Sequence, residues 1–331
     1  MTSWTGRKVL VTGGAGFIGS HLCEALLARG AEVTVFTRYS SRGVAGAIDD
    51  LPKAARDSLR MVMGDLKDPS GVDAAIAGQE VVFHLAAHIG IPYSYVHPLD
   101  VMQTNATGTA HVLEACRRHA VGKLVAFSTS EVYGSALYAP IDEAHPLQAQ
   151  SPYAASKVAA DALALSYWRS FGTPVALCRP FNTFGPRQPA RAVLPTIIGQ
   201  ALRGADRIRL GALTPTRDFL FVEDTVAGTL RVAESETTLG EVVNLGTGTE
   251  ITIGDAAAVI LRAVGRDIPI EEDPARIRPQ KSEVVRLIAD YAKAERLLGW
   301  RPATSFEDGI ARTVEWVRRH PGFLVDGGYH V

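Results

Sequence analysis

A glycine-rich turn near the N-terminus constrains the fold of this chain more than any other feature of its sequence. The apolar run Arg7–Thr12 leads directly into Gly13-Gly14-Ala15-Gly16-Phe17-Ile18-Gly19, and an amphipathic stretch follows. Glycines permit a tight turn and let backbone N–H groups approach a pyrophosphate at the start of a helix. A strand, this turn and a helix therefore predict a dinucleotide-binding loop, with contacts from Gly13, Gly16, Phe17, Ile18 and Gly19.

The first 180 residues alternate short apolar runs with amphipathic stretches. The apolar runs are rich in Val and Leu, as is typical of strands covered on both faces of a parallel sheet. They are Arg7–Thr12, Glu32–Thr37, Leu59–Met63, Val81–Leu85, Lys123–Ser128 and Pro174–Arg179. Helical patterns between them include Phe17–Arg29, Val101–His119 and Pro152–Phe171. This alternation predicts a Rossmann-type α/β fold with a doubly wound parallel sheet.

The rhythm changes after Pro180, where prolines and glycines become more frequent and the expected elements become shorter. We therefore predict two domains with interwoven boundaries. Residues 1–180 form the dinucleotide-binding domain, and residues 181–331 form a smaller C-terminal α/β domain that binds the substrate.

Charge and composition exclude several classes of protein. The chain has 34 Lys and Arg against 35 Asp and Glu, so it has no basic excess for binding nucleic acid. No apolar run approaches the roughly 20 residues of a membrane span, and the polar N-terminus does not resemble a signal peptide. Cys23, Cys116 and Cys178 are far apart and odd in number, so we expect neither disulfides nor a metal site. These features predict a soluble cytoplasmic protein.

The end of the second apolar run bears on the identity of the dinucleotide. An acidic residue there would accept a hydrogen bond from the ribose 2′-OH of NAD, but the sequence reads Thr37-Arg38-Tyr39-Ser40-Ser41-Arg42. Arg38, with Ser40, Ser41 or Arg42, can instead hold a 2′-phosphate, although Arg38 can also be solvated or stack on adenine. We therefore favour NADP slightly over NAD. Further cofactor contacts are expected from residues after the third and fourth strands and from a later helix: Asp65, Leu66, Leu85, Ala86, Ala87 and Asn105.

The run Tyr153-Ala154-Ala155-Ser156-Lys157 places a phenol and an ammonium on one face of a predicted helix. A lysine beside a tyrosine favours the phenolate and lowers the pKa of the phenol from about 10, so Tyr153 becomes a usable general base. With the glycine loop and the preceding Ser128-Thr129-Ser130-Glu131, this run resembles the extended short-chain dehydrogenase/reductase superfamily. Members of that superfamily bind NAD or NADP and mostly act on nucleotide sugars.

The resemblance assigns roles to several residues. Thr129 corresponds to the residue that hydrogen-bonds the reacting oxygen. Thr129-Ser130-Glu131 resembles the pattern of sugar 4,6-dehydratases, whereas epimerases usually have small residues after the threonine. Three further stretches resemble dehydratases acting on nucleotide-linked N-acetylglucosamine in legionaminic-acid-type pathways: residues 89–95, 179–188 and 215–219. By the same resemblance, the sugar nucleotide would contact Asn182, Arg217, Arg278 and Glu283.

These assignments imply a redox-neutral dehydration. Tyr153 would accept the O4 proton during oxidation at C4, Lys157 and Thr129 would steady the charge, and Glu131 would remove the C5 proton. Ser130, a water or protonated Glu131 would help the C6 hydroxyl to leave. The alternatives are a 4-epimerase or a UDP-glucuronate decarboxylase of the same superfamily and, less favoured, a non-catalytic NAD(P)-binding regulator. The resemblance also implies a homodimer built on the helices predicted at 101–119 and 152–171.

Overall fold

The computed structural model describes residues 3–41, 45–277 and 279–323. Its centre is a seven-stranded sheet in the order β3-β2-β1-β4-β5-β6-β11, with every neighbouring pair parallel. The strands are β1 (Lys8–Thr12), β2 (Glu32–Thr37), β3 (Arg60–Met63), β4 (Val81–His84), β5 (Lys123–Phe127), β6 (Val175–Pro180) and β11 (Val242–Leu245). The six predicted strands and the α/β fold class are confirmed. The seventh strand comes from the second half of the chain and was not predicted.

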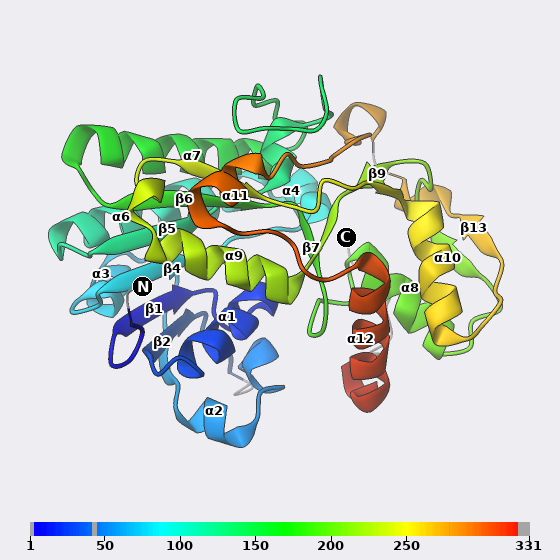
Figure 1. The fold of residues 1–331 in the computed structure, drawn as a ribbon, viewed down its shortest axis with the longest axis horizontal. Coiled ribbons are helices and arrows are strands. Elements are labelled where there is room, and N and C mark those ends of the chain that lie inside the picture. The colour runs from blue at the N-terminus through cyan, green and yellow to red at the C-terminus, as the bar shows by residue number, and fades with distance from the viewer. Residues whose placement is uncertain (1–2, 42–44, 278, 324–331) are drawn as a thin grey trace.

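Helices cover both faces of this sheet (Figure 1). One face is covered by α1 (Phe17–Leu27) and α9 (Val222–Glu234), which contact each other. The other face is covered by α3 (Pro69–Ile76), α6 (Gly108–Arg118) and α7 (Pro152–Phe171). Successive strand residues point to opposite faces, so in β1 the side chains of Val9 and Val11 join one core cluster and that of Leu10 joins the other.

The helix predicted over 101–119 is not continuous. The chain forms α5 (Pro98–Met102), then a π-helical turn over Gln103–Thr107, and then α6. Short π-helical insertions are rare and concentrate at functional sites. This turn contains Asn105, which is 1% exposed.

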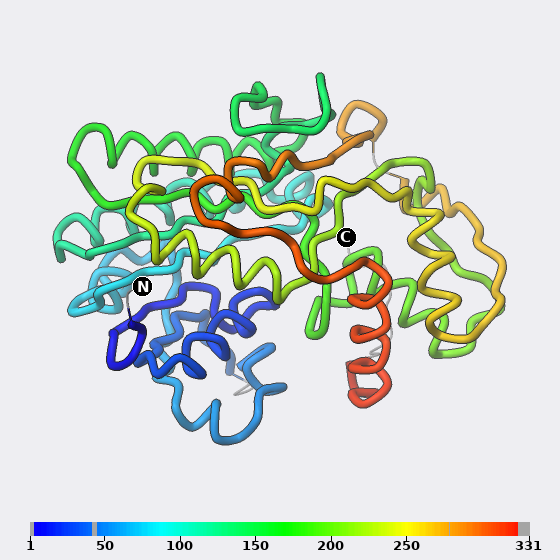
Figure 2. The backbone as a smooth tube through the Cα atoms, in the orientation of Figure 1, coloured from blue at the N-terminus to red at the C-terminus, as the bar shows by residue number. Residues whose placement is uncertain are grey.

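A smaller unit lies beside the sheet and contains α8 (Val193–Leu202), α10 (Ile253–Val264) and α12 (Phe306–Arg319) (Figures 1 and 2). Its strands form three pairs: β7 (Asn182–Phe184) with β10 (Phe219–Phe221), β9 (Thr216–Arg217) with β12 (Ile251–Thr252), and β8 (Ile208–Leu210) with β13 (Ile270–Glu272). A core of its own includes Phe184, Phe221 and Ile260. The predicted domain boundary at residue 180 stays a prediction. Three elements after residue 180, namely α9, β11 and α11 (Ala292–Leu298), pack with the large sheet.

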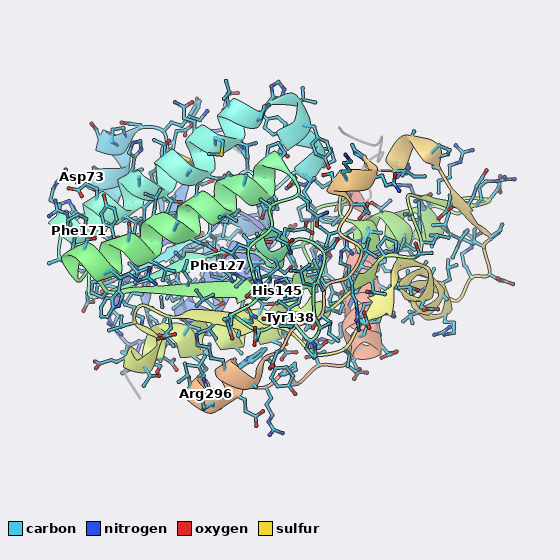
Figure 3. All side chains as sticks on the ribbon, turned by 90° about the horizontal axis from the view of Figure 1, so that it is seen from above. Asp73, Phe127, Tyr138, His145, Phe171 and Arg296 are labelled. Atoms are coloured by element: carbon cyan, nitrogen blue, oxygen red, sulfur yellow. The ribbon has the colours of Figure 1, made fainter. Side chains whose placement is uncertain are left out.

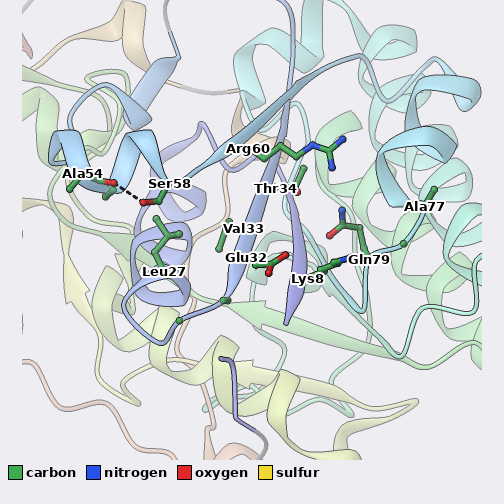
Figure 4. A pocket seen from close by; sticks show the side chains of 14 residues that line it. Lys8, Leu27, Glu32, Val33, Thr34, Ala54, Ser58, Arg60, Ala77 and Gln79 are labelled. Carbon is green, nitrogen blue, oxygen red and sulfur yellow. Dashed lines mark hydrogen bonds between the residues drawn. The ribbon is translucent and has the colours of Figure 1, made fainter. Parts of the chain in front are cut away.

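The two edges of the sheet differ in what they offer a ligand. The amino ends of the strands border an open hollow of about 640 Å³, lined among others by Lys8, Glu32, Arg60 and Gln79 (Figure 4). The carboxyl ends of β1 and β4 meet where the strand order reverses, which is where ligands bind in open α/β sheets. Of the residues predicted above, the glycine loop follows β1 and Thr129–Glu131 follow β5 at that carboxyl edge.

Among the described helices, none is long and apolar enough to cross a bilayer.

Candidate active site

The glycine loop joins the carboxyl end of β1 to the first turn of α1. Gly13 has a φ of +71°, and a Cβ at this position would lie 2.8 Å from the backbone nitrogen of Ala86. A Cβ on Gly19 would collide with the Gly13 carbonyl. Gly16 precedes α1 and leaves the helix start without a side-chain cap. The loop therefore forms a backbone cradle at a helix N-terminus, and these residues fit the pyrophosphate of a dinucleotide.

A buried histidine, which the sequence analysis missed, connects this loop to the π-helical turn. His84 Nδ1 lies 2.8 Å from Thr12 Oγ1, and its Nε2 lies 3.0 Å from Thr109 Oγ1. The Thr109 hydroxyl donates its one proton to the carbonyl of Asn105. It therefore accepts a hydrogen bond from His84, so the neutral imidazole of His84 carries its proton on Nε2. Burial, with a smaller contribution from Lys157, lowers the pKa of His84 to about 3. The only signal in the sequence was a polar residue within an otherwise apolar run.

The residues predicted to contact the adenosine half of the cofactor follow β2, β3 and β4. Arg38 is exposed immediately after β2, and Asp65 is half-buried after β3, where its Oδ1 accepts from the backbone nitrogen of Lys67 at 2.9 Å. Leu66 is buried in the core, and the backbone after β4 passes beside the glycine loop at Ala86. Arg42 lies outside the described residues. The cofactor roles of Leu66, Leu85, Ala86 and Ala87 stay predictions.

Asn105 supports the helix that carries the candidate catalytic residues. Its Oδ1 accepts from the backbone nitrogen of His88 at 2.7 Å. Its Nδ2 donates to the His88 carbonyl and to Ser156 Oγ, both at 2.9 Å. Ser156 lies between Tyr153 and Lys157 in α7. The side chain of Asn105 therefore joins the turn after β4 to α7.

Tyr153 and Lys157 are both buried near the start of α7. Ser151 caps this helix by accepting from the Ala154 backbone nitrogen at 3.1 Å. The Lys157 ammonium donates to the carbonyl of Phe127 at 2.6 Å, and Figure 3 shows Phe127 next to α7. The i, i+4 spacing puts both side chains on one face of α7, where Lys157 reaches the end of β5 and Tyr153 reaches Thr129.

The predicted lowering of the Tyr153 pKa by Lys157 is wrong in this structure. Burial raises the pKa of Tyr153 above its usual range and outweighs a hydrogen bond from Thr129, while the charge of Glu131 raises it further. Burial also lowers the pKa of Lys157. Desolvation disfavours the charged form of each group, and the ammonium is turned toward the Phe127 carbonyl.

Thr129, Ser130 and Glu131 lie in the turn that follows β5. Thr129 caps a short 3₁₀ helix (Ser130–Tyr133), and its Oγ1 accepts from the Glu131 backbone nitrogen at 3.3 Å. Ser130 is buried, whereas Thr129 and Glu131 are half-buried. The effects of Thr129 and Glu131 on the Tyr153 pKa place both close to the phenol. A hydroxyl, a carboxylate and a phenol therefore come together from two consecutive elements, the 3₁₀ turn after β5 and the start of α7.

The predicted substrate residues lie at the junction with the smaller unit. Asn182 begins β7, and its buried Oδ1 has no hydrogen-bond partner among the described residues. Buried polar atoms rarely lack a partner, so this oxygen is a candidate ligand contact. Arg217 and Glu283 pair with each other, with 3.2 Å between Nη2 and Oε1. Arg278 lies outside the described residues.

Comparison with known proteins identifies relatives over nearly the whole chain. Residues 10–313 match the family described as GDP-mannose 4,6-dehydratase. A dTDP-glucose 4,6-dehydratase of Streptomyces antibioticus is 38% identical over 321 residues, which cover 94% of this chain and 92% of the relative. The structure of DesIV, a dTDP-glucose 4,6-dehydratase of Streptomyces venezuelae with NAD and TYD bound, matches with a TM-score of 0.84. Its identity is 33%, over 95% of this chain and 98% of DesIV.

An epimerase is similar as well. The UDP-N-acetylglucosamine 4-epimerase of Methanobrevibacter ruminantium M1 matches with a TM-score of 0.86 and 30% identity, over 96% of this chain and 99% of that chain. These relatives confirm the predicted superfamily, but they lend no support to the closer resemblance to N-acetylglucosamine 4,6-dehydratases. DesIV holds NAD, so the NADP preference predicted from Arg38 finds no support either. The chain belongs to the GDP-mannose 4,6-dehydratase family, the NAD-dependent nucleotide-sugar dehydratases and epimerases of the extended short-chain dehydrogenase/reductase superfamily.

Proposed function

We propose that the chain is a nucleotide-sugar 4,6-dehydratase that converts an NDP-hexose into its 4-keto-6-deoxy product. The observation that carries this proposal is the position of Glu131, a carboxylate in the 3₁₀ turn that follows Thr129, where its charge raises the pKa of Tyr153. Oxidation at C4 needs one base, whereas elimination across C5 and C6 needs another. The names of the dehydratase relatives favour glucose as the hexose, and the motif resemblance favours N-acetylglucosamine.

The residues divide the reaction between them. A bound dinucleotide would supply the hydride acceptor for oxidation at C4 and the hydride donor for reduction at C6, while a proton derived from solvent is added at C5. Tyr153 accepts the O4 proton, and the Thr129 hydroxyl, within hydrogen-bond reach of the phenol, steadies the oxygen. The C4 ketone makes the C5 proton acidic because the resulting carbanion is an enolate. Glu131 takes that proton, and the C6 hydroxyl leaves as water with a proton from Ser130 or from the newly protonated Glu131.

The cofactor that we propose is NAD. The support is the NAD bound in the DesIV structure. Mass spectrometry of the dinucleotide released from purified protein tests this directly.

A 4-epimerase is the second candidate, because a solved epimerase is as similar in fold as the dehydratases are. A UDP-glucuronate decarboxylase is the third candidate, because decarboxylases of the superfamily have a run similar to Thr129-Ser130-Glu131. Incubation with dTDP-glucose, UDP-N-acetylglucosamine and UDP-glucuronate separates the three. Loss of one water supports the proposal, an unchanged mass with inverted C4 indicates an epimerase, and loss of CO₂ indicates a decarboxylase.

We also propose a homodimer built on the layer of α5, α6 and α7. Apolar side chains on this layer are exposed, with Leu99 at 82% and Phe171 at 59%. Sedimentation equilibrium of the full chain tests this, and a monomer at micromolar concentration would contradict it.

A further inference from the structure

A buried ion pair lies beside the candidate active site and has no place in the proposed reaction. Arg179 comes from β6, and Asp161 comes from α7, one helical turn after Lys157. The side chains are 3% and 4% exposed, and 2.7 Å separates Nη2 from Oδ2. Charges this deeply buried are costly unless their hydrogen bonds are satisfied. The remaining hydrogen bonds of the pair therefore indicate what it does.

Arg179 holds both ends of the segment that carries Thr129 and Glu131. Its Nε donates to Ser128 Oγ at 3.2 Å, and its Nη1 donates to the hydroxyl of Tyr133 at 2.7 Å. Ser128 immediately precedes Thr129, and Tyr133 closes the 3₁₀ helix that contains Glu131. A guanidinium offers several donors in one rigid plane, so a single side chain can fix two points that a lysine cannot hold together.

Asp161 connects the same guanidinium to α7. Its Oδ2 accepts from Arg179 and also from Ser128 Oγ, at 2.5 Å. Asp161 lies four residues after Lys157 and eight after Tyr153, so it belongs to the rigid helix that carries both. The ion pair therefore sets where the Thr129–Glu131 segment lies relative to the phenol and the ammonium.

The network continues away from the site and is well satisfied. The Tyr133 hydroxyl donates to Asn244 Oδ1 at 2.8 Å, and the Asn244 backbone nitrogen donates to Glu143 Oε1 at 2.8 Å. Arg179 also lies over the Tyr133 ring, 4.7 Å from its centroid. Fully satisfied buried networks specify one arrangement of the groups around them.

We infer that Arg179, held by Asp161, is a positioning residue that aligns Thr129 and Glu131 with Tyr153. The inference rests on the proposed function for the identity of the two chemical steps, namely oxidation at C4 and deprotonation at C5. Misplacing a reacting group by about 1 Å can cost about 10²-fold in rate. Loosening either end of the segment should therefore slow the chemistry without removing any group that touches the substrate.

Two variants test this at different ends of the network. Tyr133→Phe removes one hydroxyl from the residue that ends the 3₁₀ helix containing Glu131 and keeps the buried ring, so it should fold. Arg179→Lys keeps the charge but cannot hold Ser128 and Tyr133 together. Tyr167→Phe is the matched control, because it removes one tyrosine hydroxyl from α7 at a contact with Glu114, outside the network.

The decisive readout is the ratio of two rates in the same sample. Transient reduction of bound NAD reports oxidation at C4, and deuterium uptake from solvent at C5 reports the Glu131 step. In Tyr133→Phe, uptake at C5 should fall by about tenfold or more relative to C4 oxidation, with KM unchanged, because displacement of Glu131 costs rate. A partly unfolded sample would lower both rates equally and leave the ratio as in the wild type. A wild-type ratio in both network variants would overturn the inference.

A second measurement needs no substrate and separates this inference from the proposed function. Amide hydrogen exchange over residues 128–133 should accelerate in Tyr133→Phe and Arg179→Lys but not in Tyr167→Phe, while α7 stays protected. If the wild type makes no 4-keto-6-deoxy sugar, the proposed function fails and this exchange result still decides the positioning role. Unchanged exchange in both network variants would refute it.

Discussion

Replacing Glu131 with glutamine should uncouple the two halves of the proposed reaction. The substitution keeps the shape of the side chain and leaves the backbone hydrogen bond from residue 131 to Thr129 Oγ1 in place, so the 3₁₀ turn should persist. It removes the only property that C5 deprotonation requires, which is basicity. A positioned acid–base group contributes roughly 10²–10⁴-fold, so formation of the 4-keto-6-deoxy product should fall by this factor. That corresponds to about 3–5 kcal/mol of activation free energy.

Oxidation at C4 should respond in the opposite direction. The negative charge of Glu131 raises the pKa of Tyr153, so removing that charge should lower the pKa of the phenol. Tyr153 acts as a base only when it can give up its own proton, so the rate of oxidation rises with pH toward the pKa of the phenol. In Glu131→Gln this rise should therefore shift to lower pH.

Stopped-flow absorbance at the nicotinamide band measures the first half, and mass spectrometry of product made in deuterated water measures the second. The expected result is accumulation of reduced cofactor with no deuterium at C5. The reasoning is refuted if Glu131→Gln releases product at the wild-type rate. It is also refuted if the wild type leaves C5 unlabelled and returns only a C4 epimer, since Glu131 would then be a structural acid.

Three further predictions concern the phenol and the cofactor. Tyr153→Phe should lower turnover by several orders of magnitude while isothermal titration still detects NAD binding, because only one hydroxyl is lost; near-normal turnover would contradict its role as the base. The protein should bind NAD more tightly than NADP. If Arg38 contacts a 2′-phosphate, Arg38→Ala should lower the affinity for NADP by more than about tenfold and leave the affinity for NAD unchanged, because a charge-assisted hydrogen bond is worth about 1.5–3 kcal/mol. Equal titration curves for NADP before and after the substitution would show that Arg38 makes no such contact. Gly13→Ala should lower both the melting temperature and NAD affinity, because φ is +71° and the new Cβ would lie 2.8 Å from the Ala86 nitrogen. Gly265→Ala is the control, because Gly265 also has a positive φ, which costs about 1–2 kcal/mol for a residue with a Cβ, but a Cβ there meets no atom within 4 Å. An equal loss of NAD affinity in the two variants would argue against a specific clash at Gly13.

Local patterns predicted the parts of this protein that depend on short stretches of chain. The glycine loop and the pair Tyr153 and Lys157 were found because turn chemistry and helical spacing are visible within a few residues. The π-helical turn at Asn105 was missed, because the apolar periodicity of residues 101–119 fits an uninterrupted helix. The sequence also did not reveal whether the Arg38 side chain is exposed, because its exposure depends on the elements around it in the folded chain.

Properties that arise from distant contacts were out of reach of the sequence. The pKa of Tyr153 depends on its burial, which the pattern Tyr-x-x-x-Lys does not reveal, so the predicted direction of the shift was wrong. His84 lies within an apolar run and Arg179 ends one, and neither pattern indicates the partners that these side chains contact on other elements. Strand β11 was missed because its four residues lie among the short elements of the second half of the chain.

The position of β11 has a consequence for how the protein is made. β6 pairs with β5 on one side and with β11 on the other. Until residues 242–245 have been synthesised, β6 is an open edge whose backbone groups can pair with another chain. The helix α9 packs against β6 and shares a core cluster with Ala176 and Cys178, and it precedes β11 in the chain by only a few residues. A ribosome-bound chain that ends near residue 180 therefore exposes an unpaired strand edge, and the large sheet can complete its folding only after residues 242–245 have been translated.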